Sequence, residues 1–576
     1  MSTFDAGDRL LRRTVLAGGG WTAGLAAVAL LGAAAELLLP AALGHAVDVA
    51  LTGGSIWWAV SACGLVAALV CVDALTDLTS GFGAARATAG LRRHLLRHLF
   101  ALDVRATRRY PVGDLVGRLV GQAADAGQAG NAVVLTVVAV LPPLGSVVAL
   151  AILEPVLGIT LLAGLVLLAV LMRAFVADAS TATAGYQRVL GVIAGRLLES
   201  LTGARTIAAA ATLRREENRV LAALPELGRH GRRTWDLLAR ASARTSAVAP
   251  LLHLSVVAVG GYALTAGWLT PGELVAAVRY AAMGAGLGAV LATLNHLVRS
   301  RAGAHRVAEP LREPATATGD RPLPPGGGAL RLRGVCVYGD DGRAVLDGID
   351  LDVPAGATVA VVGASGAGKS TLAAVAGRLH DPDRGEVRLD GVPLRDLDAS
   401  ALRRAVGYAF DQPVLIGATV HEAIGLAMPA ASATPPPADG RPATPAVLLA
   451  ARSAAIDDVI DRLPEGYRTP LADTPLSGGE TQRLGLARAF AAERLLILDD
   501  ATSSLDTATE HRITEAVVGR AGERTRLVVT HRTAAAARAD LVAWLDGGRL
   551  RGLAPHRRLW ADPDYRAVFA PAGGGS

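Results

Sequence analysis

A glycine-rich segment with a single lysine, residues 363–370, carries the residue types that bind phosphate. Its glycines let successive backbone N–H groups converge on phosphate oxygens, and the start of the next helix adds a positive dipole end. Lys369 is the only lysine among the 57 basic residues, so a compact ammonium stands where a planar guanidinium would not fit. The segment predicts a nucleoside triphosphate site with contacts from Gly363, Ser365, Gly366, Gly368, Lys369, Ser370 and Thr371.

The flanking sequence predicts the elements that position this loop. Residues 357–362 are an apolar, β-branched run and residues 371–376 an alanine-rich helix, which is the context in which such a loop binds phosphate. Lys369 is then expected to bridge the β- and γ-phosphates, and the Ser370 hydroxyl to complete a Mg²⁺ shell. Strands and helices alternate beyond residue 328, which indicates an α/β nucleotide-binding domain.

Composition divides the chain into a strongly apolar first half and a more polar second half. At 576 residues the chain is too long for one core. Hydrophobic residues make up 51% and charged residues 19%, and the net charge is +6. The arginines of the first half lie between apolar segments, which suits a membrane surface rather than nucleic acid. The three cysteines predict neither a disulfide framework nor a zinc site.

Six uncharged windows in the first half are long enough to cross a bilayer, which takes about 17 to 25 residues. They cover residues 14–35, 54–72, 131–153, 156–172, 245–272 and 280–298. Arginines gather at the N-terminus and in the two long returns, so both termini are expected in the cytoplasm. The predicted protein is a multi-pass protein of a bacterial plasma membrane, in contact with lipid.

The domain boundaries follow from these patterns. Residues 1–312 are predicted to form an all-α transmembrane domain with six helices and two cytoplasmic returns. Residues 313–328, rich in Pro, Gly, Ala and Thr, are predicted as a linker. Residues 329–576 are predicted as the ATP-binding domain. Four acidic residues border the spans, Glu36, Asp73, Asp77 and Glu154, and all lie close to a window edge, so the sequence names no substrate site among them.

The returns and the second half resemble ABC exporters of the six-helix type. Residues 102–119 contain Gly113-Asp114-Leu115, and residues 199–207 and Arg215-Glu216-Glu217 are similar to that family's cytoplasmic segments. The resemblance implies coupling helices near residues 101–110 and 206–214 that rest on the ATPase.

In the second half the resemblance to ABC ATPases implies ATP and Mg²⁺ as ligands. Tyr338 corresponds to the aromatic residue that stacks on adenine, and Asp499 to the Walker B aspartate that holds Mg²⁺ through water. Ser477, Gly478 and Gly479 resemble the ABC signature, which grips nucleotide held by a partner domain. His531 corresponds to the switch histidine. Because the signature acts on nucleotide held by a partner domain, the resemblance implies a second ABC half-transporter as partner.

The sequence departs from the family in its catalytic positions. Asp500 follows Walker B where the family usually has glutamate, and its carboxylate is one methylene shorter. Asp411 occupies the glutamine slot of the Q-loop, and Gln412 follows it. Glu480 replaces the last glutamine of the signature, a mild change, and residues 467–475 lack the family's Gly-Glu-Arg-Gly motif. ATP binding is expected to survive while hydrolysis weakens.

This pattern resembles the weak half of an asymmetric heterodimer that exports a small molecule, peptide or lipid. A homodimeric exporter with slow hydrolysis at Asp500 is the alternative. An importer with exporter architecture, for example of iron chelates, and a regulatory ATP clamp without transport also stay open.

Overall fold

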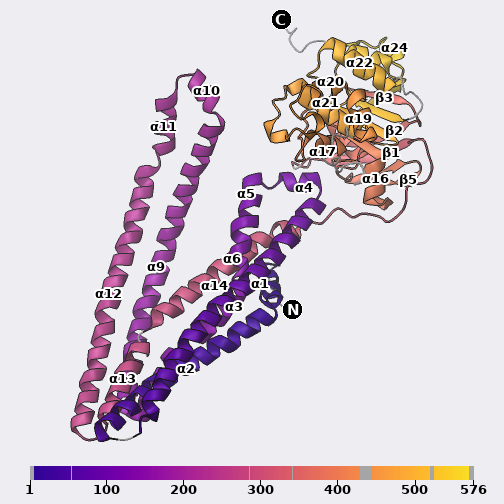
Figure 1. Cartoon of the computed structure of the whole chain (residues 1–576). Coiled ribbons are helices and arrows are strands. Elements are labelled where there is room, and N and C mark those ends of the chain that lie inside the picture. The colour runs from indigo at the N-terminus through magenta and orange to yellow at the C-terminus, as the bar shows by residue number, and fades with distance from the viewer. Residues whose placement is uncertain are drawn as a thin grey trace. The chain divides into compact units, whose positions relative to one another are not determined.

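The computed structural model describes residues 6–53, 55–284, 286–339, 341–428, 444–518 and 524–569. The chain forms two compact units (Figure 1). The first contains the chain up to Phe100 together with Pro111–Glu313, and the second contains Ala101–Tyr110 together with the chain from Pro314 onward. The ten residues Ala101–Tyr110 therefore pack with a unit that is otherwise built from the second half of the chain.

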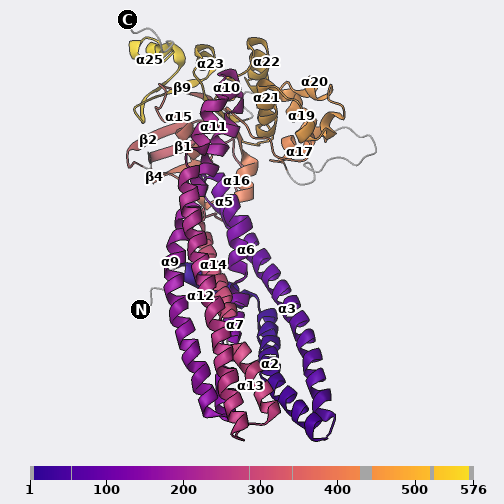
Figure 2. The ribbon, with the colours of Figure 1, turned by 90° about the vertical axis from the view of Figure 1, so that its left-hand side faces the viewer.

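Every regular element among the described residues of the first unit is a helix. Its helices are α1 (Ala6–Ala17), α2 (Gly20–Thr52), α3 (Trp57–Ala101), α5 (Val112–Gly117), a π-helix (Arg118–Gln122), α6 (Ala123–Gly127), α7 (Ala129–Ala139), α8 (Leu141–Leu153), α9 (Pro155–Thr202), α10 (Ala204–Ala209), α11 (Leu213–Leu221), α12 (Leu224–Thr265), α13 (Pro271–Gly284) and α14 (Leu287–Ala308). The long helices α9 and α12 run side by side (Figures 1 and 2). The predicted all-α transmembrane architecture is confirmed.

Three helical stretches are long and apolar enough to cross a membrane among the described residues: Gly20–Thr52, Trp57–Ala101 and Val112–Leu153. Two shorter apolar helical segments, Pro155–Leu167 and Pro250–Thr265, overlap the fourth and fifth predicted windows. The first predicted span, residues 14–35, is not one continuous helix. Helix α1 ends at Ala17, and Gly19 takes a φ of +54° before α2 begins at Gly20. A left-handed backbone suits glycine, so the arginine-rich α1 is a separate helix.

Two sheets form the second unit. One is an antiparallel sheet with strand order β2-β1-β4-β5. Its strands are β1 (Leu330–Tyr338), β2 (Ala344–Val353), β4 (Arg384–Leu389) and β5 (Val392–Pro393). The other has the order β10-β9-β3-β8-β7-β6, with all pairs parallel except β10 with β9. Its strands are β3 (Thr358–Val362), β6 (Val406–Ala409), β7 (Leu495–Asp499), β8 (Thr525–Val529), β9 (Leu541–Asp546) and β10 (Arg549–Ala554).

Helices and a buried core complete this unit. They are α4 (Val104–Arg108), α15 (Lys369–Ala376), α16 (Ala399–Ala405), α17 (Val420–Gly425), α19 (Pro445–Ser453), α20 (Asp457–Ile460), α21 (Gly478–Ala489), α22 (Thr507–Val518), α23 (Thr533–Arg538), α24 (His556–Leu559) and α25 (Pro563–Ala567). One core joins β1 through Leu332, β3 through Val361 and α15 through Leu372. Parallel strands with near-continuous apolar runs are typical of sheets covered on both faces, and the predicted α/β domain is confirmed.

Candidate nucleotide-binding site

The loop at residues 363–368 leaves the carboxyl end of β3 and leads into α15. Gly368 takes a φ of +93°, and a Cβ there would lie 2.7 Å from the carbonyl oxygen of Val345, so only glycine fits. Helix α15 begins at Lys369, whose side chain is 7% exposed. Its Nζ donates to the carbonyl oxygens of Gly363 and Ala364, both at 2.9 Å. Burial lowers the pKa of the Lys369 ammonium, while the nearby Asp500 and Asp499 carboxylates oppose that shift.

Asp499, at the end of β7, is positioned by two hydroxyl groups. Ser370 Oγ donates to its Oδ1 at 3.0 Å, and the Tyr408 hydroxyl donates to its Oδ2 at 3.2 Å. Burial raises the pKa of the Asp499 carboxyl and, more strongly, that of the Tyr408 phenol. A hydroxyl and a carboxylate are the hard oxygen ligands that suit Mg²⁺, which completes its shell with water and substrate phosphates. Ser370 and Asp499 therefore fit the predicted ion.

Asp500 and His531 face each other across the neighbouring strand ends. Asp500 Oδ2 lies 3.3 Å from Nε2 of His531, which follows β8. The backbone of Asp500 has a φ of +48°, in the left-handed region that aspartate tolerates better than most residues. Burial raises the pKa of the Asp500 carboxyl, and the proximity of His531 counteracts this. The two predicted catalytic residues thus form one contact at the carboxyl edge of the sheet.

Asp411, in the Q-loop slot, contacts the loop after β7 at residues 503–506, which resembles the D-loop of ABC ATPases. Its Oδ1 accepts a hydrogen bond from Ser503 Oγ at 2.6 Å. Gln412 is exposed, and no hydrogen bond from it to these groups occurs in the described residues. The structure therefore places the anionic residue, not the glutamine beside it, in contact with the D-loop.

Gln482 on α21, which the sequence analysis did not single out, joins these segments. Its side chain is 2% exposed. The Nε2 donates to the carbonyl oxygens of Asp411 at 3.1 Å and Asp500 at 3.3 Å and to Ser503 Oγ at 3.2 Å. Its Oε1 accepts from the Ser504 backbone N–H at 3.2 Å. One buried amide thus connects the signature helix, the Q-loop and the residue after Walker B.

Ser477 caps the N-terminus of α21 in a capping box with Glu480. The Ser477 hydroxyl and backbone N–H both donate to Glu480 Oε2 at 2.8 Å. These bonds lower the pKa of the Glu480 carboxyl. An ionised carboxylate therefore occupies the positive end of the signature helix, so Glu480 affects the signature more directly than the sequence suggests. No hydrogen bond in the described residues joins Ser477, Gly478 or Gly479 to the phosphate loop.

Tyr338 ends β1 beside a segment from the first half of the chain. Its N–H donates to Asp383 Oδ2 at 2.8 Å. Arg105 on α4 donates to the same carboxylate oxygen at 3.3 Å and also to the Tyr338 carbonyl. Ala101–Tyr110, the first predicted coupling segment, thus contacts the residues around the predicted adenine site. The second predicted segment, residues 206–214, belongs to the helical unit.

A phosphate loop, a carboxylate that fits Mg²⁺ and a signature helix on one sheet define an ATP-binding domain, and the same chain carries membrane-spanning helices. Residues 24–284 match the family "ABC transporter transmembrane region", and residues 346–503 match "ABC transporter". The chain belongs to the ABC transporters, with the permease and the ATPase fused in one polypeptide.

Individual relatives agree with this assignment. The chain is 48% identical over 542 residues to the ABC transporter ATP-binding protein RamA of Streptomyces coelicolor, covering 93% of this chain and 83% of that protein. It is 44% identical over 217 residues to the mycobactin import ATP-binding/permease protein IrtA of Mycolicibacterium smegmatis, covering 37% of this chain and 24% of that protein. A bacterial Atm1-family ABC exporter with ATP bound matches with a TM-score of 0.77 and 26% identity, covering 99% of this chain and all of that one.

Proposed function

We propose that this chain is the weakly hydrolysing half of a heterodimeric ABC exporter. In the proposal the loop at residues 363–370 holds ATP at its own site, while Ser477, Gly478 and Gly479 serve the nucleotide of a different partner chain. The ATP-binding unit lies in the cytoplasm, and the helical unit spans a bacterial plasma membrane. The cargo is a small molecule, a peptide or a lipid.

The observation that carries the proposal is the contact of Asp500 with His531 at 3.3 Å. Asp500 stands where the family's glutamate orients the attacking water. Its carboxylate falls about an ångström short of that position, a misplacement that costs roughly a hundredfold in rate. Its pairing with His531 keeps the short side chain directed toward the histidine.

The remaining site residues support ATP binding. Lys369 and the backbone N–H groups of its loop neutralise and orient phosphate oxygens. Ser370 and Asp499 would hold Mg²⁺, which when bound offsets charge on the transferring phosphoryl group. Tyr338 would stack on adenine. None of these positions departs from the family pattern, so loss of hydrolysis is expected without loss of binding.

The ATPase activity of the full-length chain purified alone tests the proposal. A weak site without its partner gives slow, vanadate-insensitive turnover. Brisk vanadate-sensitive hydrolysis by the chain alone would contradict the heterodimer and favour the alternative, a homodimer. Co-purification with a second half-transporter that carries a catalytic glutamate is the positive result expected in the native membrane.

Transport in the opposite direction is the second candidate, since one relative is named as an importer of mycobactin. Export predicts ATP-dependent accumulation of cargo inside inside-out vesicles. Import predicts accumulation only in vesicles of the opposite orientation. A regulatory ATP clamp predicts neither.

A further inference from the structure

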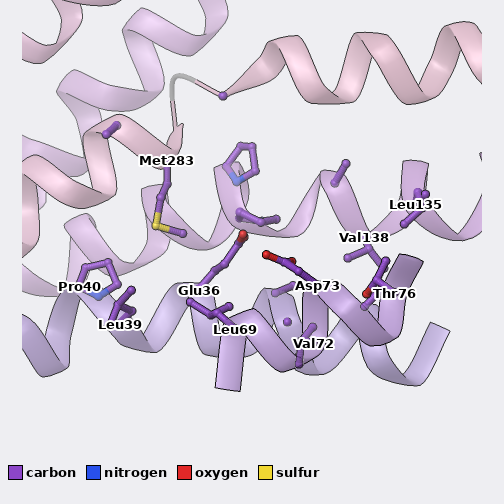
Figure 3. A pocket seen from close by; sticks show the side chains of 18 of the residues that line it. Glu36, Leu39, Pro40, Leu69, Val72, Asp73, Thr76, Leu135, Val138 and Met283 are labelled. Carbon is purple, nitrogen blue, oxygen red and sulfur yellow. The ribbon is translucent and has the colours of Figure 1, made fainter. Parts of the chain in front are cut away.

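The helical unit contains a cavity of about 720 Å³ bordered by α2, α3, α7, α8, α13 and α14 (Figure 3). Most of its lining is apolar, with small residues on α2 and larger side chains such as Leu69, Val72 and Met283. Pockets for organic ligands usually have 300 to 1,000 Å³, an apolar lining and a few convergent polar groups. This cavity therefore has the size and character of a site for a drug-sized molecule.

Two carboxylates from different helices line this cavity, at the same distance from the turn that joins their helices. Glu36 lies 16 residues before Thr52, the end of α2, and Asp73 lies 16 residues after Trp57, the start of α3. At 1.5 Å per residue both are about 24 Å from the turn that joins the helices. Figure 3 shows their carboxylates directed toward each other. The antiparallel helix pair thus brings together two acids that are far apart in the sequence.

Neither carboxylate has a cationic partner among the described residues. No hydrogen bond or ion pair of the described chain involves Glu36 or Asp73, and the one basic side chain that borders the cavity, Arg279 on α13, forms no ion pair with them. Unpaired acids at membrane depth are costly, and two like charges in one site disfavour each other. A cation between them would offset both costs.

We propose that this cavity binds cargo that is an amphipathic organic cation. Its cationic group lies between Glu36 and Asp73, and its apolar part packs against Leu69, Val72 and the polarisable thioether of Met283. The inference rests on the proposed transport function and specifies its substrate class. In this proposal Glu36 and Asp73 attract the cationic group of the cargo, and Arg279 does not contribute to that attraction.

Direct binding of a matched pair of lipophilic ions tests this site without ATP. The probes are tetraphenylphosphonium and tetraphenylborate, which share shape and differ in sign, with the full-length chain in lipid nanodiscs and empty nanodiscs subtracted. We expect at least tenfold tighter specific binding of the cation. Glu36→Gln combined with Asp73→Asn should weaken cation binding at least tenfold and remove the preference for the cation.

Arg279→Gln is the matched control, because it removes a charge from the same lining and should leave cation binding unchanged or tighter. The single variants Glu36→Gln and Asp73→Asn provide the test if the double variant fails to fold, and each should weaken cation binding severalfold. Equal binding of both ions, unchanged binding in the acid variants, or loss of cation binding in Arg279→Gln would each overturn the assignment.

The two proposals fail in different experiments. Cation binding that depends on Glu36 and Asp73, without ATP-driven movement of the cation into vesicles, would retain the site and reject transport. ATP-driven transport of another cargo that is insensitive to both acid substitutions would retain transport and reject the site.

Discussion

Asp500 Oδ2 lies 3.3 Å from Nε2 of His531, so the residue after Walker B and the switch histidine are in direct contact. In this arrangement the short carboxylate is directed toward the histidine, and its φ of +48° fixes the backbone from which it projects.

Asp500→Glu should raise ATP hydrolysis by the assembled complex about tenfold to a hundredfold, because the longer side chain reaches the attacking water. Turnover of purified complex in nanodiscs measures this, with Asp500→Asn as the control that should stay at or below the parent rate. An unchanged rate in Asp500→Glu would indicate that Asp411 or the short segment before the signature also disables the site.

Lys369→Ala should abolish ATP binding at this site, because the loop loses the only ammonium that meets the phosphates. Photolabelling of the full-length chain with an azido-ATP analogue is the measurement. Arg557→Ala, which removes an exposed cation on α24, is the control and should label like the parent. Normal labelling of Lys369→Ala would refute the assignment of the loop.

Tyr408→Phe should raise the Mg²⁺ concentration needed for half-maximal ATP binding about two- to tenfold, because Asp499 loses a hydrogen-bond donor worth roughly 0.5 to 1.5 kcal/mol. Tyr467 supplies a matched control, since its buried hydroxyl has no hydrogen-bond partner among the residues that the structure describes. Tyr467→Phe should leave the Mg²⁺ dependence unchanged. Equal effects of both substitutions would show that the phenol acts through packing alone.

Gln482→Met should loosen the D-loop while retaining the volume of the buried side chain. The substitution leaves the carbonyls of Asp411 and Asp500 without this donor, at a cost of about 1 to 3 kcal/mol for buried groups. Hydrogen–deuterium exchange should become faster in peptides that cover residues 500–505, with little change around α15. Unchanged exchange there would mean that Gln482 does not hold these segments together.

Asp500→Asn should raise the melting temperature of the full-length protein at pH 7. Burial raises the pKa of the Asp500 carboxyl in the folded state, so its ionisation opposes folding at pH values above that raised pKa. The cost disappears as the pH falls toward the unfolded value of about 4, so the gain should shrink there. An equal gain in melting temperature at pH 7 and near pH 4 would show that the gain does not come from removing the Asp500 charge.

The phosphate-binding part of the site could be predicted from sequence because its residues are adjacent. One strand and one helix are enough to position residues 363–370. Asp499 ends an apolar run that predicts a buried strand. The contacts of Tyr408 and Gln482 could not be predicted this way, since they depend on which strand ends meet and on side-chain rotamers. Gln482 follows the signature serine by five residues on α21, and the packing of that helix buries its side chain.

Glu36 and Asp73 show a different limit. Each lies close to the edge of an apolar window, and this position alone is as consistent with the membrane surface as with its interior. Their equal spacing from the turn between α2 and α3 was the available signal, because antiparallel helices bring residues at equal spacing to the same level. The break at Gly19 was likewise visible as three consecutive glycines, residues 18–20.

The packing of Ala101–Tyr110 with the second unit has a consequence for biogenesis. Leu102 pairs with Ala315, and the Thr316 N–H donates to the Ala101 carbonyl at 2.8 Å. During synthesis Ala101–Tyr110 is made before Pro111–Glu313, and the residues that it packs against, from Pro314 onward, are made last. The ATP-binding unit therefore cannot finish folding until most of the helical unit has been synthesised, and a fragment starting at Pro314 would lack one of its own pieces.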